Sequence, residues 1–304
     1  MKIAVIGAGA MGSLFGALLA ESGENVWLYD IWKEHVKAIN KKDLDIELNG
    51  KTRSVSVNAT TDKSQIGKTD LAIIFVKSTQ THDAAVTASE LMGINGYVLT
   101  LQNGMGNADI IGEIIDPGRI IAGTTSHGAT MLGPGSIRHA GTGPTVIGIW
   151  SGIQKTGIQK IADVFNKAGI ITETVKDVRN VIWAKLLVNV GINAITALTG
   201  IKNGRILDLS VTKALSRAAV EEAVEVARAQ GVIVADNTVE HVFQVAEATS
   251  VNRSSMGQDV DNKRQTEISA INGAVVKEAQ KLGINVPVNQ TLTTLIETLQ
   301  AHYQ

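Results

Sequence analysis

Hydrophobic and polar positions divide the chain into two halves of different character. In the first half, short runs of β-branched and other apolar residues alternate with helical patterns, at 2–6, 25–29, 71–76 and 97–101. The first helical pattern begins at about Met11. Strands separated by helices predict a mostly parallel sheet joined by right-handed crossovers.

Two features add further strands to this half. The runs 45–48 and 54–57 flank Asn49-Gly50, a dipeptide that favours the tight turn of a hairpin. Residues 118–150 are rich in Gly, Thr, Ser and β-branched residues and predict strands and loops.

The second half is helical. Amphipathic patterns predict helices over 178–198, 211–230, 237–249, 258–281 and 288–301. Gly231 and Gly283 stand where C-terminal caps are expected. We therefore predict an α/β domain in residues 1–177 and an all-α domain in 178–304, with the cleft between them as the expected ligand site.

An uncharged run at 3–20 imitates a signal sequence or membrane span. Gly7, Gly9, Gly12 and Gly16 interrupt it, and its first residues have the pattern of a buried strand. Although Gly12 and Gly16 have GxxxG spacing, we interpret the run as a strand and a helix of a cytoplasmic protein. No other stretch is expected to approach a span.

Composition narrows the chemistry. The 304 residues include 28 basic and 29 acidic side chains, so net charge gives no reason to expect nucleic acid or an anionic membrane as partner. With no cysteine, the chain has neither a thiol nucleophile nor a thiolate metal site.

Gly7-Ala8-Gly9-Ala10-Met11-Gly12 matches GxGxxG, directly after a predicted strand and at the start of a helix. This context indicates a Rossmann-type domain that binds a dinucleotide pyrophosphate at the helix N-terminus; the alternative is a tight turn without ligand. Asp30 ends the second strand and favours NAD over NADP, because its carboxylate binds a ribose hydroxyl and repels a 2′-phosphate. Lys33 nearby could contact such a phosphate, or lie exposed on a helix.

A polar stripe marks the helix predicted over 178–198. Lys185, Asn189 and Asn193 are spaced i, i+4, i+8 in an otherwise apolar stretch. They fall on one side of the helix, which is either its solvent face or a polar strip facing the interdomain cleft with Lys185 as proton donor.

A second candidate stretch surrounds Ser255. Ser255 and Gln258 have capping-box spacing, so the serine either caps a helix or, at an exposed helix N-terminus, receives a substrate carboxylate. Glu267 borders an apolar stripe and either reaches an inward lysine or lies exposed. Lys77 and Asn103 follow predicted strands, where ligands of α/β sheets bind. The six histidines have no metal-ligand spacing and receive no catalytic role.

Together these residues resemble the ketopantoate reductase (2-dehydropantoate 2-reductase) family along essentially the whole chain. The matching segments are Gly7–Gly12, Val76-Lys77-Ser78-Thr79-Gln80, Leu101-Gln102-Asn103-Gly104, His139-Ala140-Gly141-Thr142-Gly143, Trp183-Ala184-Lys185 with Asn189 and Asn193, Asn203-Gly204, residues 254–259, and Thr266-Glu267-Ile268 with Ile271-Asn272-Gly273.

The resemblance implies a Rossmann domain for NAD(P)H and a helical domain for a small 2-oxo acid, in pantothenate biosynthesis. It implies that Lys185 is the general acid and that Glu267 orients it. It also implies substrate binding by Asn103, Asn189, Asn193, Asn203 and Ser255, and places Lys77 and Asn103 by the cofactor. No metal is implied.

Asp30 departs from the family pattern, which generally favours NADPH. The chain is therefore either an NADH-using ketopantoate reductase or a relative of NAD-dependent D-2-hydroxyacid dehydrogenases that act on bulkier 2-oxo acids. A non-catalytic dinucleotide sensor would not need the Lys185 group, and a sugar- or glycerol-phosphate dehydrogenase would need clustered basic residues, whereas Arg205, Arg253 and Arg264 are scattered. The apolar content fits either a homodimer through the helical domain or packing within one subunit.

Overall fold

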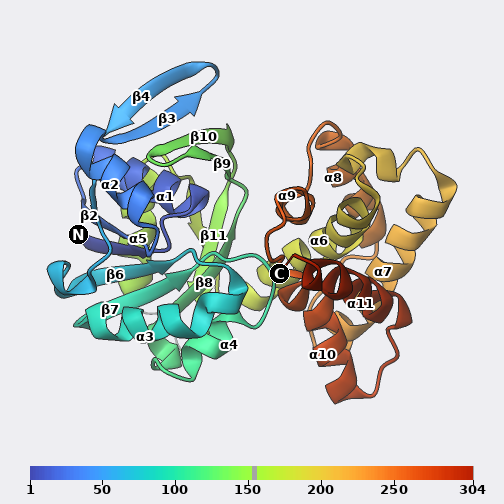
Figure 1. Ribbon diagram of the computed structural model, residues 1–304. Helices are drawn as coiled ribbons and strands as arrows, with labels where there is room; N and C mark the ends of the chain where they lie inside the picture. Colours follow the sequence, from blue (N-terminus) through green and yellow to red (C-terminus); the bar gives the residue numbers. More distant parts are fainter. Residues whose placement is uncertain (153–155, 304) are drawn as a thin grey trace. The chain divides into compact units, whose positions relative to one another are not determined.

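The chain folds into two compact units. The computed structural model describes residues 1–152 and 156–303 (Figure 1). The first unit comprises Met1–Gln102 and Asn107–Val178, and the second comprises Asn103–Gly106 and Arg179–Gln304. Each unit has its own apolar core.

Twelve strands are present among the described residues, all in the first unit. They are β1 (Lys2–Ile6), β2 (Asn25–Tyr29), β3 (Leu44–Leu48), β4 (Lys51–Val55), β5 (Asn58–Thr60), β6 (Thr69–Ile74), β7 (Met92–Thr100), β8 (Ile120–Thr125), β9 (Gly128–Gly133), β10 (Ser136–Gly141), β11 (Thr145–Ile149) and β12 (Thr172–Thr174). They form an eight-stranded sheet in the order β12-β11-β8-β7-β6-β1-β2-β5 and a four-stranded sheet in the order β4-β3-β10-β9.

The large sheet has the topology of a dinucleotide-binding domain. From β5 to β8 all neighbouring strands are parallel. The strand β11 pairs antiparallel with β8, and β12 pairs parallel with β11. Those six parallel strands follow the order 3-2-1-4-5-6, in which the direction of winding reverses beside β1. The predicted mostly parallel sheet is thus confirmed, and the carboxyl end of β1 is the place where such folds bind ligands.

Helices cover both faces of this sheet. The first unit contains α1 (Ala10–Glu21), α2 (Lys33–Lys42), α3 (Thr81–Leu91), α4 (Asn107–Gly112) and α5 (Thr156–Lys167). Apolar side chains of α1 and α5 share one core with the sheet, where Phe15 and Phe165 make an edge contact with ring centroids 6.0 Å apart. The small sheet also packs against α1, which therefore lies between two sheets (Figure 1).

The predicted hairpin is present between β3 and β4. Asn49 and Gly50 both have positive φ, 52° and 75°, as a two-residue turn of this kind requires. The strand predicted over 71–76 is displaced, since β6 is Thr69–Ile74. Phe75 still donates its N–H to Ile6 O at 2.9 Å, so the sheet contact continues past the end of the strand.

The second unit is helical. Its α-helices are α6 (Val178–Thr199), α7 (Ser210–Ala229), α8 (Thr238–Ala248), α9 (Ser255–Asp261), α10 (Asn272–Leu282) and α11 (Pro287–Ala301). Gly283 closes α10 in the left-handed conformation, as predicted, and Gly231 follows α7 with φ 78°. The fold class, a parallel-sheet domain followed by a helical part, is confirmed.

The single helix predicted over 258–281 is wrong. The helix α9 ends at Asp261 because Lys263 adopts φ 51°, while Arg264 N–H donates to Asp259 O and Lys263 N–H to Val260 O. This is a Schellman ending, which usually carries glycine at the left-handed position. Because the residue at this position is a lysine, the sequence gives no sign that the helix ends here. A 3₁₀ turn, η5 (Ile268–Ala270), then precedes α10.

From the sequence, no stretch other than 3–20 was expected to approach a membrane span. Among the described residues, α6 shows that this expectation was wrong. By length and composition α6 is apolar enough to cross a membrane, and 61% of its most apolar window is buried. Most of its apolar side chains between Trp183 and Ala197 belong to the core of the second unit. The run at 3–20, in contrast, divides into β1 and α1 as expected.

Candidate active site

The glycine-rich turn connects β1 to α1, and its three glycines have different surroundings. Gly7 has φ 93°, and a Cβ there would lie 2.8 Å from Val76 N. A Cβ on Gly12 would lie 1.9 Å from Gly7 O, so the helix begins in direct contact with the turn. A Cβ on Gly9 would meet nothing within 4 Å. The open side of the turn is therefore at Gly9, where a phosphate can approach the backbone.

The first turn of α1 is suited to an anion. Gly9 is its N-cap residue, no side chain caps the helix, and no acidic residue stands in the first turn. The first N–H groups of a helix lack intrahelical partners and carry partial positive charge. The residues predicted to bind the dinucleotide, Gly7 to Gly12, thus form a cradle of the right chemistry for a pyrophosphate.

Asp30 is tied to this turn. Its carboxylate accepts hydrogen bonds from Ala8 N–H at 2.6 Å and from Trp32 N–H at 2.9 Å. The side chain is half-buried, and its negative charge lies beside the turn.

The loops after β6 and β7 are joined by Gln102. Its Nε2 donates to Val76 O at 2.8 Å and to Thr81 Oγ1 at 2.9 Å, while its Oε1 accepts from Thr100 Oγ1. This side chain fixes the segment that contains Lys77, the N-cap residue of a 3₁₀ turn, η2 (Ser78–Gln80). Lys77 therefore stands at the carboxyl edge of the sheet, as its place in the sequence predicted.

A lysine and a glutamate come together in the second unit. Lys185 and Asn189 on α6 are half-buried, and Asn193, two turns after Lys185, is buried. This stripe is therefore not the solvent face of the helix. Burial lowers the pKa of Lys185 to about 8, and the charge of Glu267 opposes that fall. Glu267 is itself 8% exposed and lies just before η5.

The segment Asn103–Gly106 belongs to the second unit although it follows β7. Met105 N–H donates to Ala270 O at 2.8 Å, and a Cβ on Gly104 would lie 2.3 Å from the same oxygen. Ala270 is the last residue of η5, the 3₁₀ turn that begins directly after Glu267. Asn103 therefore belongs to the same compact unit as Lys185.

A third segment is anchored to the end of α6. Ser254 Oγ lies 2.7 Å from Thr196 Oγ1, one turn beyond Asn193. Ser254, not Ser255, is the N-cap residue of α9, since its Oγ accepts from Gly257 N–H at 3.0 Å. The capping-box interpretation of Ser255 is wrong. Ser255 is exposed in the first turn of α9, so its hydroxyl is not used as the cap.

Asn203 lies beside the same segment, at the start of η4 (Asn203–Ile206). Its N–H donates to Asn252 O at 3.0 Å, and its Nδ2 donates to Thr249 Oγ1 at 3.0 Å. Its Oδ1 is buried and accepts no hydrogen bond in the structure. A buried carbonyl oxygen without a donor is costly, which makes this atom available to a ligand or water donor.

Three histidines that are buried or half-buried come together in the structure in ways that no sequence pattern indicated: His35 and His139 are buried, and His127 is half-buried. His127 Nδ1 lies 3.2 Å from His139 Nε2, with the rings stacked 5.4 Å apart between centroids. His35 is fully buried, and Ser13 Oγ links it to Ala8 O of the glycine-rich turn. Burial is the main cause that lowers the pKa of all three, so each is neutral near pH 7. The spacing of residues within a strand or helix does not reveal contacts between histidines and residues of other elements, so the sequence alone did not predict these sites.

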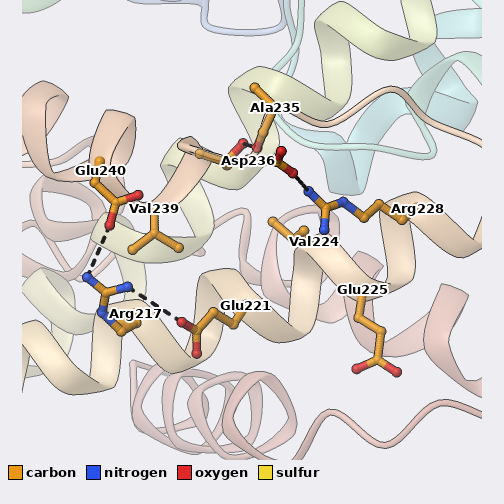
Figure 2. Close-up of a pocket in the computed structure, with 10 residues that line it drawn as sticks. Arg217, Glu221, Val224, Glu225, Arg228, Ala235, Asp236, Val239 and Glu240 are labelled. Atoms are coloured by element: carbon orange, nitrogen blue, oxygen red, sulfur yellow. Dashed lines mark hydrogen bonds and ion pairs between the residues drawn. The ribbon is translucent and has the colours of Figure 1, made fainter.

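A groove of about 540 Å³ lies between α7 and α8 (Figure 2). Arg217 faces Glu240 and Glu221, and Arg228 pairs with Asp236 at 2.8 Å. Because each of these arginines already faces a carboxylate, the groove is poorly suited to an acidic substrate. The predicted site residues lie elsewhere.

The family of the chain follows from comparison with known proteins. Residues 3–152 match the model of the family described as ketopantoate reductase PanE/ApbA, and residues 177–300 match the model of its C-terminal part. The chain belongs to the ketopantoate reductase family. The resemblance seen in the sequence is thus confirmed.

Full-length relatives support this membership. The 2-dehydropantoate 2-reductases of Halobacterium salinarum and Pyrococcus abyssi are each 38% identical to this ketopantoate reductase family member. Both alignments cover 99% of this chain, and 99% and 98% of the respective relatives.

Solved structures of two kinds resemble the whole chain. D-mandelate dehydrogenase in complex with NADH and anilino(oxo)acetate superposes with a TM-score of 0.94 at 29% identity, over 100% of this chain and 99% of that one. The PanE/ApbA family ketopantoate reductase from Ralstonia eutropha superposes with a TM-score of 0.92 at 34% identity, over 100% of both.

Proposed function

We propose that this protein is a 2-dehydropantoate 2-reductase that uses a nicotinamide dinucleotide as hydride donor. The observation that carries the proposal is Lys185, a half-buried ammonium group whose pKa burial lowers to about 8 against the opposing charge of Glu267. A proton donor whose pKa lies near neutrality is the group that carbonyl reduction requires. The names of the full-length relatives support this substrate.

The proposed reaction converts a keto carbon to a secondary alcohol. The dihydronicotinamide, when bound, supplies the hydride. As the hydride reaches the keto carbon, negative charge develops on the carbonyl oxygen. The Nζ of Lys185 stabilises that charge and transfers its proton to the oxygen, which leaves a neutral amine that water reprotonates. Glu267 keeps Lys185 protonated by raising its pKa.

The amides of the second unit suit the remainder of the substrate. Asn189 and Asn193 follow Lys185 along α6, and carboxamides offer both donors and acceptors to a hydroxyl or carboxylate. We propose Asn103, Asn203 and Ser255 as further substrate-binding residues. The unpartnered Oδ1 of Asn203 supports its proposed role in substrate binding, because a substrate hydroxyl would supply the donor that this buried atom lacks.

The residues of the first unit fit a dinucleotide. The open side of the turn at Gly9 and the uncapped start of α1 would hold the pyrophosphate, with Lys77 nearby at the sheet edge. We propose NADH as the preferred form, because the charge of Asp30 repels a 2′-phosphate. In Asp30→Asn, the ratio of kcat/KM with NADH to kcat/KM with NADPH should fall about tenfold, whereas Lys33→Ala should leave it unchanged. An unchanged ratio in Asp30→Asn would remove Asp30 from cofactor selection.

A second candidate substrate class is a bulkier 2-oxo acid. The observation that favours it is the similarity to D-mandelate dehydrogenase with NADH, whose bound anilino(oxo)acetate carries an aromatic ring. An NADH-using D-2-hydroxyacid dehydrogenase would use the same lysine chemistry. Only the side chains around the substrate's tail would differ.

Steady-state kinetics separates these candidates. We expect NADH oxidation with 2-dehydropantoate to give the highest kcat/KM in a panel that includes branched and aromatic 2-oxo acids. Higher kcat/KM with phenylglyoxylate, the keto acid of mandelate, would favour the dehydrogenase. Binding of NADH without oxidation by any member of the panel would instead indicate a sensor.

The setting of the enzyme is part of the proposal. We propose a cytoplasmic protein that has a small 2-oxo acid as its partner and acts without nucleic acid or membrane. A homodimer through the helical unit is the proposed assembly, and sedimentation of the purified protein at micromolar concentration tests it.

A further inference from the structure

A chain of hydrogen bonds runs through the first unit to the glycine-rich turn. The turn between β9 and β10 donates Gly135 N–H to His35 Nδ1 at 2.9 Å. His35 Nε2 lies 3.1 Å from Ser13 Oγ, and Ser13 Oγ donates to Ala8 O at 2.8 Å. Both His35 and Ser13 are fully buried.

The direction of these bonds follows from the donors. Because Gly135 N–H donates to Nδ1, that nitrogen carries no proton, and the single proton of the neutral ring is on Nε2. Nε2–H therefore donates to Ser13 Oγ. A hydroxyl has one proton, and Ser13 directs it to Ala8 O. His35 thus decides which way the serine hydroxyl points.

The Ala8 carbonyl in turn sets the direction of an N–H group. The Ala8–Gly9 peptide bond is trans, so its C=O and N–H point in opposite directions. With Ala8 O fixed toward Ser13, Gly9 N–H points away from it. Gly9 is also the residue whose surroundings are open, so its backbone is accessible to a ligand. On the other side of Ala8, its own N–H is fixed by Asp30.

We infer that His35, acting through Ser13, is a positioning residue that presents the Gly9 N–H to the pyrophosphate of the bound dinucleotide. This inference rests on the proposed dinucleotide binding and adds a buried pair outside the GxGxxG motif to it. Gly135 sets the ring tautomer from the second sheet, a hundred residues along the chain from His35.

Two substitutions of His35 separate the two ring nitrogens. His35→Asn keeps an acceptor near Gly135 N–H and loses the donor to Ser13. His35→Gln places an amide donor near Ser13 and loses the acceptor for Gly135. Ser13→Ala removes the hydroxyl that links His35 to Ala8 O. Ser22→Ala is a matched control, because Ser22 Oγ makes a similar 2.8 Å bond to Leu19 O at the other end of α1.

The experiment measures Kd for NADH by fluorescence and for ADP-ribose, which has the pyrophosphate but no nicotinamide, by calorimetry. We expect Ser13→Ala and His35→Asn to raise both Kd values about tenfold, and His35→Gln and Ser22→Ala to change them less than about twofold. The KM of the keto acid should not change in any variant. Thermal unfolding shows whether each variant is folded. If His35→Asn does not fold, the Kd values of Ser13→Ala test the inference.

Two results would overturn the inference. One is unchanged Kd in Ser13→Ala, and the other is equal loss in His35→Asn and His35→Gln, which would indicate packing alone. If the unsubstituted protein bound neither NADH nor ADP-ribose, the proposed function would fail instead.

Discussion

Glu267 raises the pKa of Lys185 while burial lowers it, and burial has the larger effect. The two residues are 82 positions apart in the sequence, on α6 and just before η5. Their opposition leaves Lys185 with a pKa of about 8, so the lysine is largely protonated at pH 7 and gives up its proton readily.

Removing the ammonium should separate binding from turnover. In Lys185→Ala we expect NADH to bind with unchanged Kd, and kcat for ketopantoate reduction to fall at least about a hundredfold, the usual contribution of a positioned acid. Lys277→Ala, an exposed lysine on α10, is the control and should keep full activity. A loss of only a few-fold in Lys185→Ala would exclude the lysine as the acid.

The pH dependence of reduction should report the same lysine. Reduction needs the protonated form, so kcat/KM should decline as pH rises through about 8, whereas alcohol oxidation should increase over that range. In Glu267→Gln the charge that raises the pKa is lost, and the decline should move to lower pH. Stopped-flow or steady-state rates from pH 6 to 10 provide the test, and identical profiles in both proteins would rule out the role proposed for Glu267.

Two glycines of the cofactor turn should respond differently to alanine. Gly9 has φ −59° and open surroundings, so Gly9→Ala should fold normally but raise the Kd of NADH about tenfold or more, because the methyl group occupies the phosphate's approach. In Gly12→Ala the new Cβ meets Gly7 O, and the free energy of unfolding should fall by about 1–3 kcal/mol. Calorimetric unfolding combined with NADH titration distinguishes these outcomes. Equal stability of the two variants would contradict the close contact.

Three histidines, two of them buried and one half-buried, should make the first unit less stable in mild acid. Burial lowers the pKa of His35, His127 and His139 in the folded protein, while the unfolded chain keeps values near 6.5. As pH falls below about 6.5, the unfolded state takes up protons that the folded state does not, so the free energy of unfolding decreases. The stabilisation is fully present above that pH.

Urea titrations at half-unit steps from pH 8 to 5 measure this decrease. His127→Gln should flatten the curve, since one of the three groups is removed. A curve that is already flat in the unsubstituted protein between pH 7 and 5.5 would show that the histidines protonate in the folded state as easily as in the unfolded one.

The sequence by itself determined the features that depend on near neighbours along the chain. The alternation of strands and helices, the Asn49-Gly50 turn, the GxGxxG turn before α1 and the polar stripe from Lys185 to Asn193 all follow from local periodicity and backbone preference. The family resemblance drew on the same motifs. The break at Lys263 was missed because a non-glycine residue there adopts the left-handed conformation.

Only the tertiary structure decided which distant residues meet. It attached Asn103–Gly106 to Ala270 in the second unit, brought Glu267 to Lys185, and placed His35 between Gly135 and Ser13. These contacts arise when packed elements bury their apolar faces, and no short-range pattern in the sequence encodes their register. The pKa of Lys185 and the direction of the Ser13 hydroxyl both depend on such contacts, so the chemistry of this protein is a property of its packing.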